Sequence, residues 1–125
     1  MPTDIIIKVD GLDLPAVLDD TDCARAVAAI LPMAVHPNTW GEEYYFEVAA
    51  DCGLDETATV RVAVGDIGYW PPGRAVAVFF GRTPMSTGDD PVPASEVNII
   101  GRITGDAALL KQAPGPRSLK IEKAG

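Results

Sequence analysis

The chain has 125 residues, of which 47% are hydrophobic and 22% charged, as is usual for one globular domain and unusual for a disordered or fibrous chain. Its formal charge of −8 opposes binding to nucleic-acid phosphates, and its apolar runs fall far short of the roughly 20 residues that cross a bilayer. Because the opening residues also lack the pattern of a secretory signal, we expect a single cytoplasmic domain over residues 1–125, with no nucleic-acid or membrane partner.

The first elements along the chain are a hairpin and a helix. Isoleucines and valine at 5–9, an Asp-Gly turn and the apolar run at 14–18 predict an opening hairpin. Polar N-cap side chains before Cys23 are followed by apolar residues at helical spacing, which predicts a helix over about 21–31, ended by Pro32. A short strand at 33–36, the turn PNTWG and an alternating strand at 43–49 follow.

The second half of the chain reads as strands separated by turns. The alternation TATVRVAV predicts a strand at 57–64, and GDIGYW at 65–70 predicts another, which ends at the prolines of PPG. AVAVFF at 75–80 is apolar on both sides, and the residues 82–96 have no periodicity and predict an irregular surface loop. The last expected elements are a strand at 97–103, a short helix at 106–113 and a strand at 117–123.

These elements amount to about eight strands and two short helices joined mostly by tight turns. Antiparallel strands connected in this way hide their edges by closing on themselves. We therefore predict a mainly β fold, a closed antiparallel β-barrel whose ends are covered by the helices.

Four segments of the chain carry a family resemblance: IIIKVDG at 5–11, LPMAVHPNTWGEEYYFEV at 31–48, GDIGYWPPGRAVAVFFGRTPMS at 65–86 and VNIIGRI at 97–103. Together they resemble the small prokaryotic cyclophilin-like family, with its pattern close to WGxExYF, GDxxYWPPG, FFGxTPxS and NxxGxI. The resemblance spans most of the chain and implies a cyclophilin-fold barrel.

The resemblance does not extend to the prolyl isomerase site of true cyclophilins. Those proteins carry an Arg flanked by His and Phe and a Gln-Gly-Gly-Asp run, whereas this chain has His36 as its sole histidine and no Gly-Gly pair. Isomerisation needs a hydrogen-bond donor aimed at the prolyl nitrogen beside an apolar ring pocket. The sequence does not place any of its arginines there.

Metal and cofactor chemistry has no signature in this sequence. Cys23 and Cys52 lie far apart with no CxxC motif, and one histidine is too few for the usual zinc sites. Neither a GxGxxG nor a GxxxxGK[ST] phosphate loop occurs. We expect no metal, no cofactor, and two reduced, inert thiols.

Polar and aromatic residues crowd the segments that carry the resemblance. Glu43 and Tyr45 share one face of their predicted strand, and Asn98 and Arg102 have the same parity on theirs and would face the same side. The residues predicted to bind a ligand are Trp40, Glu43, Tyr45, Tyr69, Phe79, Pro84, Ser86, Asn98 and Arg102.

Several of these residues also have a purely structural interpretation. Trp40 would pack over a barrel end, and a neighbouring glutamate would cap backbone amides in the turn. Phe79 and Phe80 point to opposite faces of their strand and would both belong to the core. A structural hydrogen bond or a surface ion pair would explain Asn98 and Arg102 equally well.

Three functions are compatible with these observations. The first is a binding module whose groove on the barrel holds a small molecule or a proline-containing peptide. The second is a divergent peptidyl-prolyl cis-trans isomerase, which rests on fold analogy. The third is a subunit of an amide-cleaving or carboxyltransferase-type assembly, which would need a protein partner that the sequence does not identify.

Overall fold

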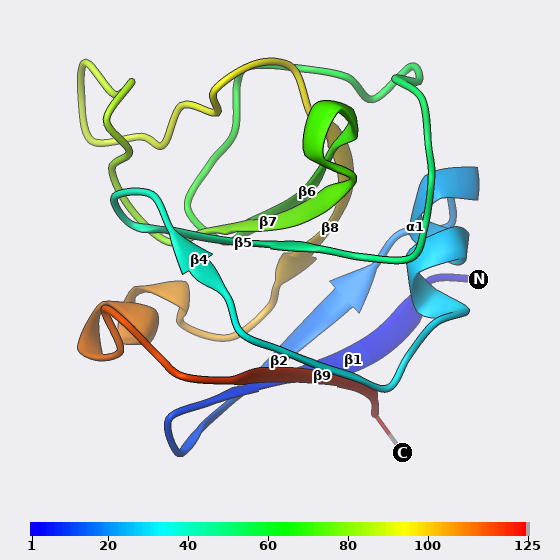
Figure 1. The fold of residues 1–125 in the computed structure, drawn as a ribbon, viewed down its shortest axis with the longest axis horizontal. Helices are drawn as coiled ribbons and strands as arrows, with labels where there is room; N and C mark the ends of the chain where they lie inside the picture. Colours follow the sequence, from blue (N-terminus) through cyan, green and yellow to red (C-terminus); the bar gives the residue numbers. More distant parts are fainter. Residues whose placement is uncertain (125) are drawn as a thin grey trace.

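The strands of the computed structural model, which describes residues 1–124, form one antiparallel sheet of nine strands. They are β1 (Thr3–Val9), β2 (Leu12–Leu18), β3 (Met33–Val35), β4 (Asn38–Thr39), β5 (Glu43–Glu47), β6 (Asp66–Trp70), β7 (Ala75–Phe79), β8 (Asn98–Ile103) and β9 (Leu119–Lys123). The helices are α1 (Asp22–Ala28) and two 3-10 helices, η1 (Pro71–Gly73) and η2 (Ala107–Gln112). Figure 1 shows α1 and η2 (orange) at opposite ends of the curled sheet.

The sheet is strongly curled but is not a fully closed barrel. Its strand order is β3-β9-β1-β2-β8-β6-β7-β5-β4, so the two outermost strands, β3 and β4, are neighbours in the chain (Figure 1). Only residues 36 and 37 separate them, and no ladder between β3 and β4 occurs within residues 1–124. The mainly β, antiparallel prediction is confirmed, whereas the closed barrel is corrected to a curled sheet whose edges are joined by the chain itself.

The opening hairpin is confirmed, with strands slightly longer than expected. Val9 pairs with Leu12, and the two residues between them have positive φ angles, 47° at Asp10 and 81° at Gly11. Two positive φ angles in a two-residue loop give the turn whose twist matches that of paired strands, which explains the Asp-Gly signal.

The predicted helix is confirmed in position, although it is shorter than expected. Thr21 caps it, because its hydroxyl accepts a hydrogen bond from the amide of Ala24 at 3.1 Å. The α-helix ends at Ala28, and the amides of Ile30 and Leu31 bond three residues back, as in a tightened last turn. The second predicted helix forms as the 3-10 helix η2, which is capped by Asp106.

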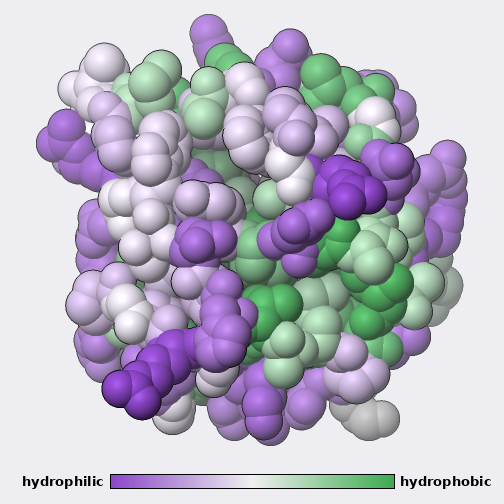
Figure 2. Space-filling view, viewed as in Figure 1, coloured by the Kyte–Doolittle hydropathy of each residue, from purple (hydrophilic) through white to green (hydrophobic). Residues whose placement is uncertain are grey.

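The main core lies inside the curl of the sheet. Tyr44, Phe46 and Val48 are all buried in it, as the alternation along 43–49 predicts. The ring centres of Tyr44 and Phe80 lie 4.6 Å apart. The Tyr69 hydroxyl donates a hydrogen bond to the Ala50 carbonyl at 2.6 Å. In Figure 2, the apolar side chains on the face shown gather in the part of the view that contains α1, β1 and β9, and polar side chains rim that face.

The strand predicted at 57–64 is wrong. This segment makes a single bridge, between Thr59 and Val97, and is otherwise irregular. Its amides are bonded by nearby side chains instead of a ladder: Thr57 donates to the Asp55 carboxylate, and Ala63 donates to that of Asp66. Local side-chain acceptors thus replace strand pairing. The predicted turn at PNTWG, in contrast, contains the two-residue strand β4.

The remaining strands agree with the sequence to within two residues at each end. β6 ends at Trp70, where the prolines of η1 begin, and the loop predicted at 82–96 contains no strand or helix. In residues 1–124 there is no helix with the length and hydropathy of a membrane span.

Candidate functional site

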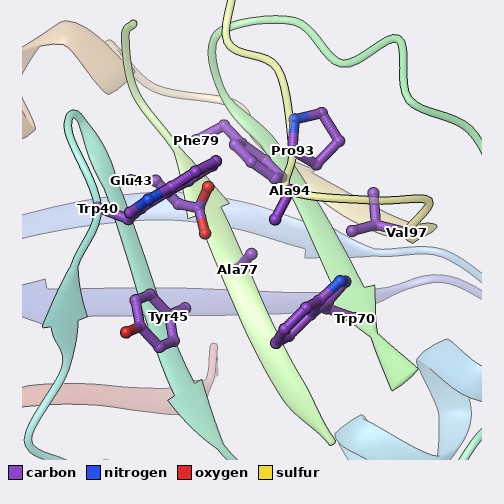
Figure 3. Close-up of a pocket in the computed structure, with 9 residues that line it drawn as sticks. All are labelled: Trp40, Glu43, Tyr45, Trp70, Ala77, Phe79, Pro93, Ala94 and Val97. Carbon is purple, nitrogen blue, oxygen red and sulfur yellow. The ribbon is translucent and has the colours of Figure 1, made fainter. Parts of the chain in front are cut away.

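A pocket of about 160 Å³ opens on the outer face of the sheet, opposite the main core. Here a second apolar cluster, made of Val62, Ala77, Phe79 and Val97, is covered by the segment that precedes β8. The side chains that line the pocket come from three strands, the β4–β5 turn and this segment (Figure 3). They are Trp40, Glu43, Tyr45, Trp70, Ala77, Phe79, Pro93, Ala94 and Val97.

The hollow exists because small residues sit among large ones on neighbouring strands. Glu43 on β5 pairs with Phe79 on β7, and Tyr45 pairs with Ala77, so these four side chains project from the same face. On its other side Ala77 pairs with Gly68, over which Val97 packs, because a Cβ atom at Gly68 would come within 3.0 Å of the Val97 side chain. The methyl group of Ala77 therefore leaves room between the larger side chains.

Two tryptophans form opposite walls of the pocket and are held by their own neighbours. The Trp70 indole donates to the Ser95 hydroxyl at 2.6 Å, and its ring lies against Gly73, where a Cβ atom would come within 2.8 Å of the ring. Trp40 precedes Gly41, whose positive φ of 63° and close approach to the Arg82 carbonyl require glycine. The Trp70 ring is thus held by its neighbours, and the backbone that carries Trp40 is held by the turn.

The buried Thr83 holds the segment that supplies the remaining wall. Its hydroxyl donates to the Val92 carbonyl at 2.5 Å, and its amide donates to the Ser86 hydroxyl at 3.0 Å. Ser86 in turn donates to the Asp90 carbonyl at 2.7 Å. These bonds close the loop on itself and place Pro93 and Ala94 against the pocket.

Glu43 is the one acidic side chain that lines the pocket. It is only 7% exposed, and its Oε1 atom has no hydrogen-bond partner within residues 1–124. Burial among apolar and aromatic side chains raises the pKa of this carboxyl to about 8, because its charged form loses the stabilisation of water. Figure 3 shows the carboxyl in the middle of the pocket residues, between Trp40 and Ala77.

The neighbouring Glu42 behaves differently because it points away from the pocket. Its carboxylate accepts the Arg82 amide at 3.2 Å and lies 3.9 Å from the Lys111 ammonium. Glu42 thus caps the turn, as the structural interpretation expected of one glutamate of this pair, and Glu43 is left to face the pocket. The side chain of Glu43 can donate a hydrogen bond when protonated and can balance a cation when ionised.

Four of the nine predicted ligand residues come together in this pocket: Trp40, Glu43, Tyr45 and Phe79. Their role in binding stays a prediction. The site set drawn from the sequence omitted Trp70, Ala77, Pro93, Ala94 and Val97. Ala77 could have been found from its parity with Phe79 on one strand, whereas Pro93 and Ala94 lie in a loop without periodicity.

Tyr69 and Asn98 lie on the inner side of the sheet and have structural partners. Both are 0% exposed, and they face each other across β6 and β8. The Asn98 amide accepts the Asp55 amide and donates to the Gly53 carbonyl, both at 2.9 Å. This side chain therefore fastens the turn that follows residue 51, as its structural interpretation expected.

Asn98 and Arg102 do not share a face, which corrects the parity argument. Between them β8 contains a bulge: Gly101 pairs with Ile67 and Ile99 pairs with Gly68, so Ile100 has no partner on β6. One extra residue reverses the alternation. Arg102 therefore points outward, where it lies 3.5 Å from the Asp19 carboxylate.

The two remaining predicted residues, Pro84 and Ser86, lie in the loop and outside the pocket lining. Ser86 acts through the loop hydrogen bonds given above, and Pro84 is exposed but packs beside Gly41. Both therefore belong to the support of the Trp40 turn and the loop.

The two cysteines are free thiols that lie next to each other despite their separation in sequence. Cys23 is buried, and burial followed by the neighbouring Cys52 thiol raises its pKa to about 12. A thiol in this state is a weak nucleophile. Cys52 is half-buried.

A second, shallower depression of about 390 Å³ lies beside the pocket on the far side of Trp70. Pro71, Pro72 and Leu54 line it together with Glu96 and Ser95, the residue that holds the Trp70 indole.

Comparison with known proteins identifies relatives over nearly the whole chain. The family model described as cyclophilin-like matches residues 3–122. A hypothetical protein from Archaeoglobus fulgidus, known from its solution structure, is 34% identical, with a TM-score of 0.79, and the match covers 98% of this chain and 95% of that one. No curated protein matches the chain.

Proposed function

This chain belongs to the cyclophilin-like family, and we propose that it binds a small molecule, or one side chain of a peptide, in the outer-face pocket. One observation carries the proposal: Glu43, whose buried Oε1 atom has no hydrogen-bond partner within residues 1–124, lines a hollow with aromatic walls. Buried polar groups are normally satisfied, so an unsatisfied one in a cavity suggests that a ligand completes the site.

The size of the pocket limits the ligand group that it can hold. A cavity of about 150 Å³ lined by apolar side chains accommodates one benzene molecule. The pocket, at about 160 Å³, matches one six-membered ring, one proline ring or a compact branched group.

The experiment that tests this proposal is a screen of ring-sized compounds followed by intrinsic fluorescence. Trp40 and Trp70 are the only tryptophans of the chain, so a ligand in the pocket changes the emission of both. Ala77→Leu fills the hollow and should abolish the response. Ala34→Leu, on the exposed side of β3, is the matched control and should retain it. Equal responses in both variants would place binding elsewhere.

A divergent prolyl isomerase is the second candidate, and one observation favours it. In its protonated form Glu43 is a hydrogen-bond donor beside a pocket of the size of a proline ring, although none of the nine lining side chains is an arginine. A protease-free isomerisation assay with varied X-Pro peptides tests this activity, because the uncatalysed step takes tens of seconds or longer. Acceleration that is lost in Glu43→Gln would support it, and no acceleration with any peptide would reject it.

A further inference from the structure

The pocket contains an ionisable carboxyl group without a positive partner. None of its nine lining side chains is Lys or Arg, and burial is the sole cause of the shifted pKa of Glu43, without a contribution from a nearby charge. Buried carboxylates in proteins are normally paired with a cation or a set of donors. The described part of the chain, residues 1–124, supplies no such partner for the Oε1 atom.

The walls around this carboxyl also favour a positive charge. The ring faces of tryptophan and tyrosine are electron-rich, and they attract cations that lie within about 6 Å of the ring centre. Trp40, Trp70 and Tyr45 surround the space into which Glu43 projects (Figure 3). The whole molecule adds a formal charge of −8, which raises the local concentration of cations and repels anions.

We infer that the ligand of this pocket carries a small organic cation, a methylated or otherwise substituted ammonium group, with Glu43 as its counter-ion and the aromatic rings as its walls. The inference rests on the proposed function and names the ligand class for the same site. A substituted ammonium fits better than a metal ion, because the lining offers one carboxyl and apolar surface instead of several oxygen ligands.

The cation must also shift the ionisation of Glu43. In the empty pocket at neutral pH this carboxyl is mostly protonated, because its pKa is about 8. The other titratable group that lines the pocket is Tyr45, on the same strand, and the lining residues of β6, β7 and the loop carry no titratable side chain. Binding of a cation at neutral pH would first have to remove the proton from Glu43, which costs free energy. At pH 8.5 the carboxyl is mostly ionised, so this deprotonation contributes little to the measured binding free energy.

The test compares two probes that have the same shape and differ in charge. Choline and 3,3-dimethylbutan-1-ol share the same skeleton, with a quaternary nitrogen in one and a carbon in the other. Both are titrated against the whole protein at pH 8.5 with tryptophan fluorescence and calorimetry as readouts. We expect choline to bind at least about tenfold more tightly, because ion pairing and cation–π contacts apply to it alone.

Glu43→Gln and Glu47→Gln are the matched variants. Both lie on β5, but Glu47 is exposed and pairs with Arg74 at 3.2 Å, outside the pocket. Glu43→Gln should weaken choline binding, because it removes the ion pair while the aromatic walls remain, and it should leave the alcohol's binding unchanged. Glu47→Gln should leave both affinities unchanged.

The outcomes separate this inference from the proposed function. Equal affinity of the two probes for the wild-type protein would overturn the inference, while leaving the pocket as a binding site for neutral groups. Binding of neither probe would also overturn it, and the ring-compound screen with Ala77→Leu would then decide the proposed function independently. Because the probe pair is compared on the wild-type protein, the test does not depend on how any variant folds.

Discussion

At the scale of single residues, Glu43 and Glu42 show how position decides chemistry. The two neighbours have the same side chain, but Glu43 begins β5 and lines the pocket, whereas Glu42 lies in the preceding turn and points away from the pocket. Glu42 meets a backbone amide and a lysine, whereas Glu43 meets rings and a methyl group. One carboxyl thus stabilises a turn, and the other has a pKa of about 8.

The raised pKa of Glu43 predicts a specific dependence of stability on pH. Between its ordinary pKa of 4.5 and about 8 the folded state holds this proton more tightly than the unfolded state. The resulting stabilisation is fully present below pH 4.5 and is lost as the pH rises to about 8. The free energy of unfolding should fall by at most about 1.4 kcal/mol per pH unit in this window.

Urea unfolding of the wild-type protein and Glu43→Gln at pH 5 and pH 8 measures this effect. Glutamine cannot titrate, so the variant should lose less stability than the wild-type protein between the two pH values. All other groups titrate alike in both proteins and cancel in the comparison. The same pH dependence of stability in both proteins would contradict the raised pKa of Glu43.

The cysteines give a second prediction at this scale. The Cys23 thiol is buried and has a pKa of about 12, so iodoacetamide at pH 8 should leave it unmodified in the native protein, while the half-buried Cys52 reacts. Mass spectrometry should detect one added group per native chain and two after unfolding. Native Cys52→Ser should remain unlabelled, and rapid labelling of that variant would contradict this account.

At the scale of elements, the bulge in β8 explains both an incorrect prediction and a requirement for glycine. It reverses the alternation between Asn98 and Arg102, and no residue type in VNIIGRI signals this reversal. At the bulge, Gly101 approaches β2 so closely that a Cβ atom would lie 2.1 Å from the Val17 carbonyl oxygen. The bulge therefore brings two backbones together where no side chain fits.

Gly101→Ala should therefore lower the free energy of unfolding by about 1–3 kcal/mol or more, as expected when an atom is forced into a filled space. Gly88→Ala is the matched control, because a Cβ atom at this loop glycine meets nothing within 4 Å. Its effect should stay within about 0.5 kcal/mol. Urea denaturation of both variants checks the difference, and equal stabilities would show that β2 and β8 can move apart.

Local signals in the sequence were sufficient for the elements that depend on their own residues. The Asp-Gly hairpin, the Thr21 cap and the end of β6 at the prolines were predicted correctly for this reason. The segment 57–64 was not, because its alternation resembles a strand while its amides find side-chain acceptors nearby. Whether an amide pairs with another strand or with a nearby side chain depends on the folded geometry, and the hydrophobic periodicity of the sequence does not reveal it.

The pocket was only half predictable for a similar reason. Glu43 and Tyr45 follow from parity within one strand, and Phe79 follows from its opposition to Phe80. Which strands lie beside them depends on the order β6-β7-β5, and this order brings in Trp70 and Ala77. The pairing of distant strands is set by the whole sheet and not by any one segment.

At the scale of the whole molecule, the curled sheet has two apolar sides with different uses. The inner side forms the main core, and the outer side forms the small cluster under the pocket. Phe80 and Phe79, adjacent in sequence, serve the first and the second side respectively. Stability and binding are therefore separable by substitution.

Tyr44 tests this separation from the core side. Its hydroxyl donates to the Leu110 carbonyl at 3.1 Å and to the Ala113 carbonyl, which ties η2 to the sheet. Tyr44→Phe should cost about 1–3 kcal/mol of unfolding free energy, because two buried acceptors lose their donor. Binding in the outer pocket should be unchanged.

Tyr45→Phe is the matched control for that experiment. The Tyr45 hydroxyl makes no hydrogen bond within residues 1–124, so its removal should leave thermal stability nearly unchanged. Tyr45 lies on the pocket side, so any effect should appear in ligand affinity. The opposite pattern, with stability lost in Tyr45→Phe and affinity lost in Tyr44→Phe, would contradict the division between the two sides.

The shortness of the outermost strands has a consequence for recognition. β3 has three residues and β4 has two, and Pro37 lies between them without an amide hydrogen to donate. Many peptide-binding domains capture an extended peptide by adding it as a further strand at a long open edge. Neither outermost strand offers a comparable row of backbone groups. A peptide partner would therefore be selected by the side chain that it inserts through the face of the sheet, and its backbone would contribute little.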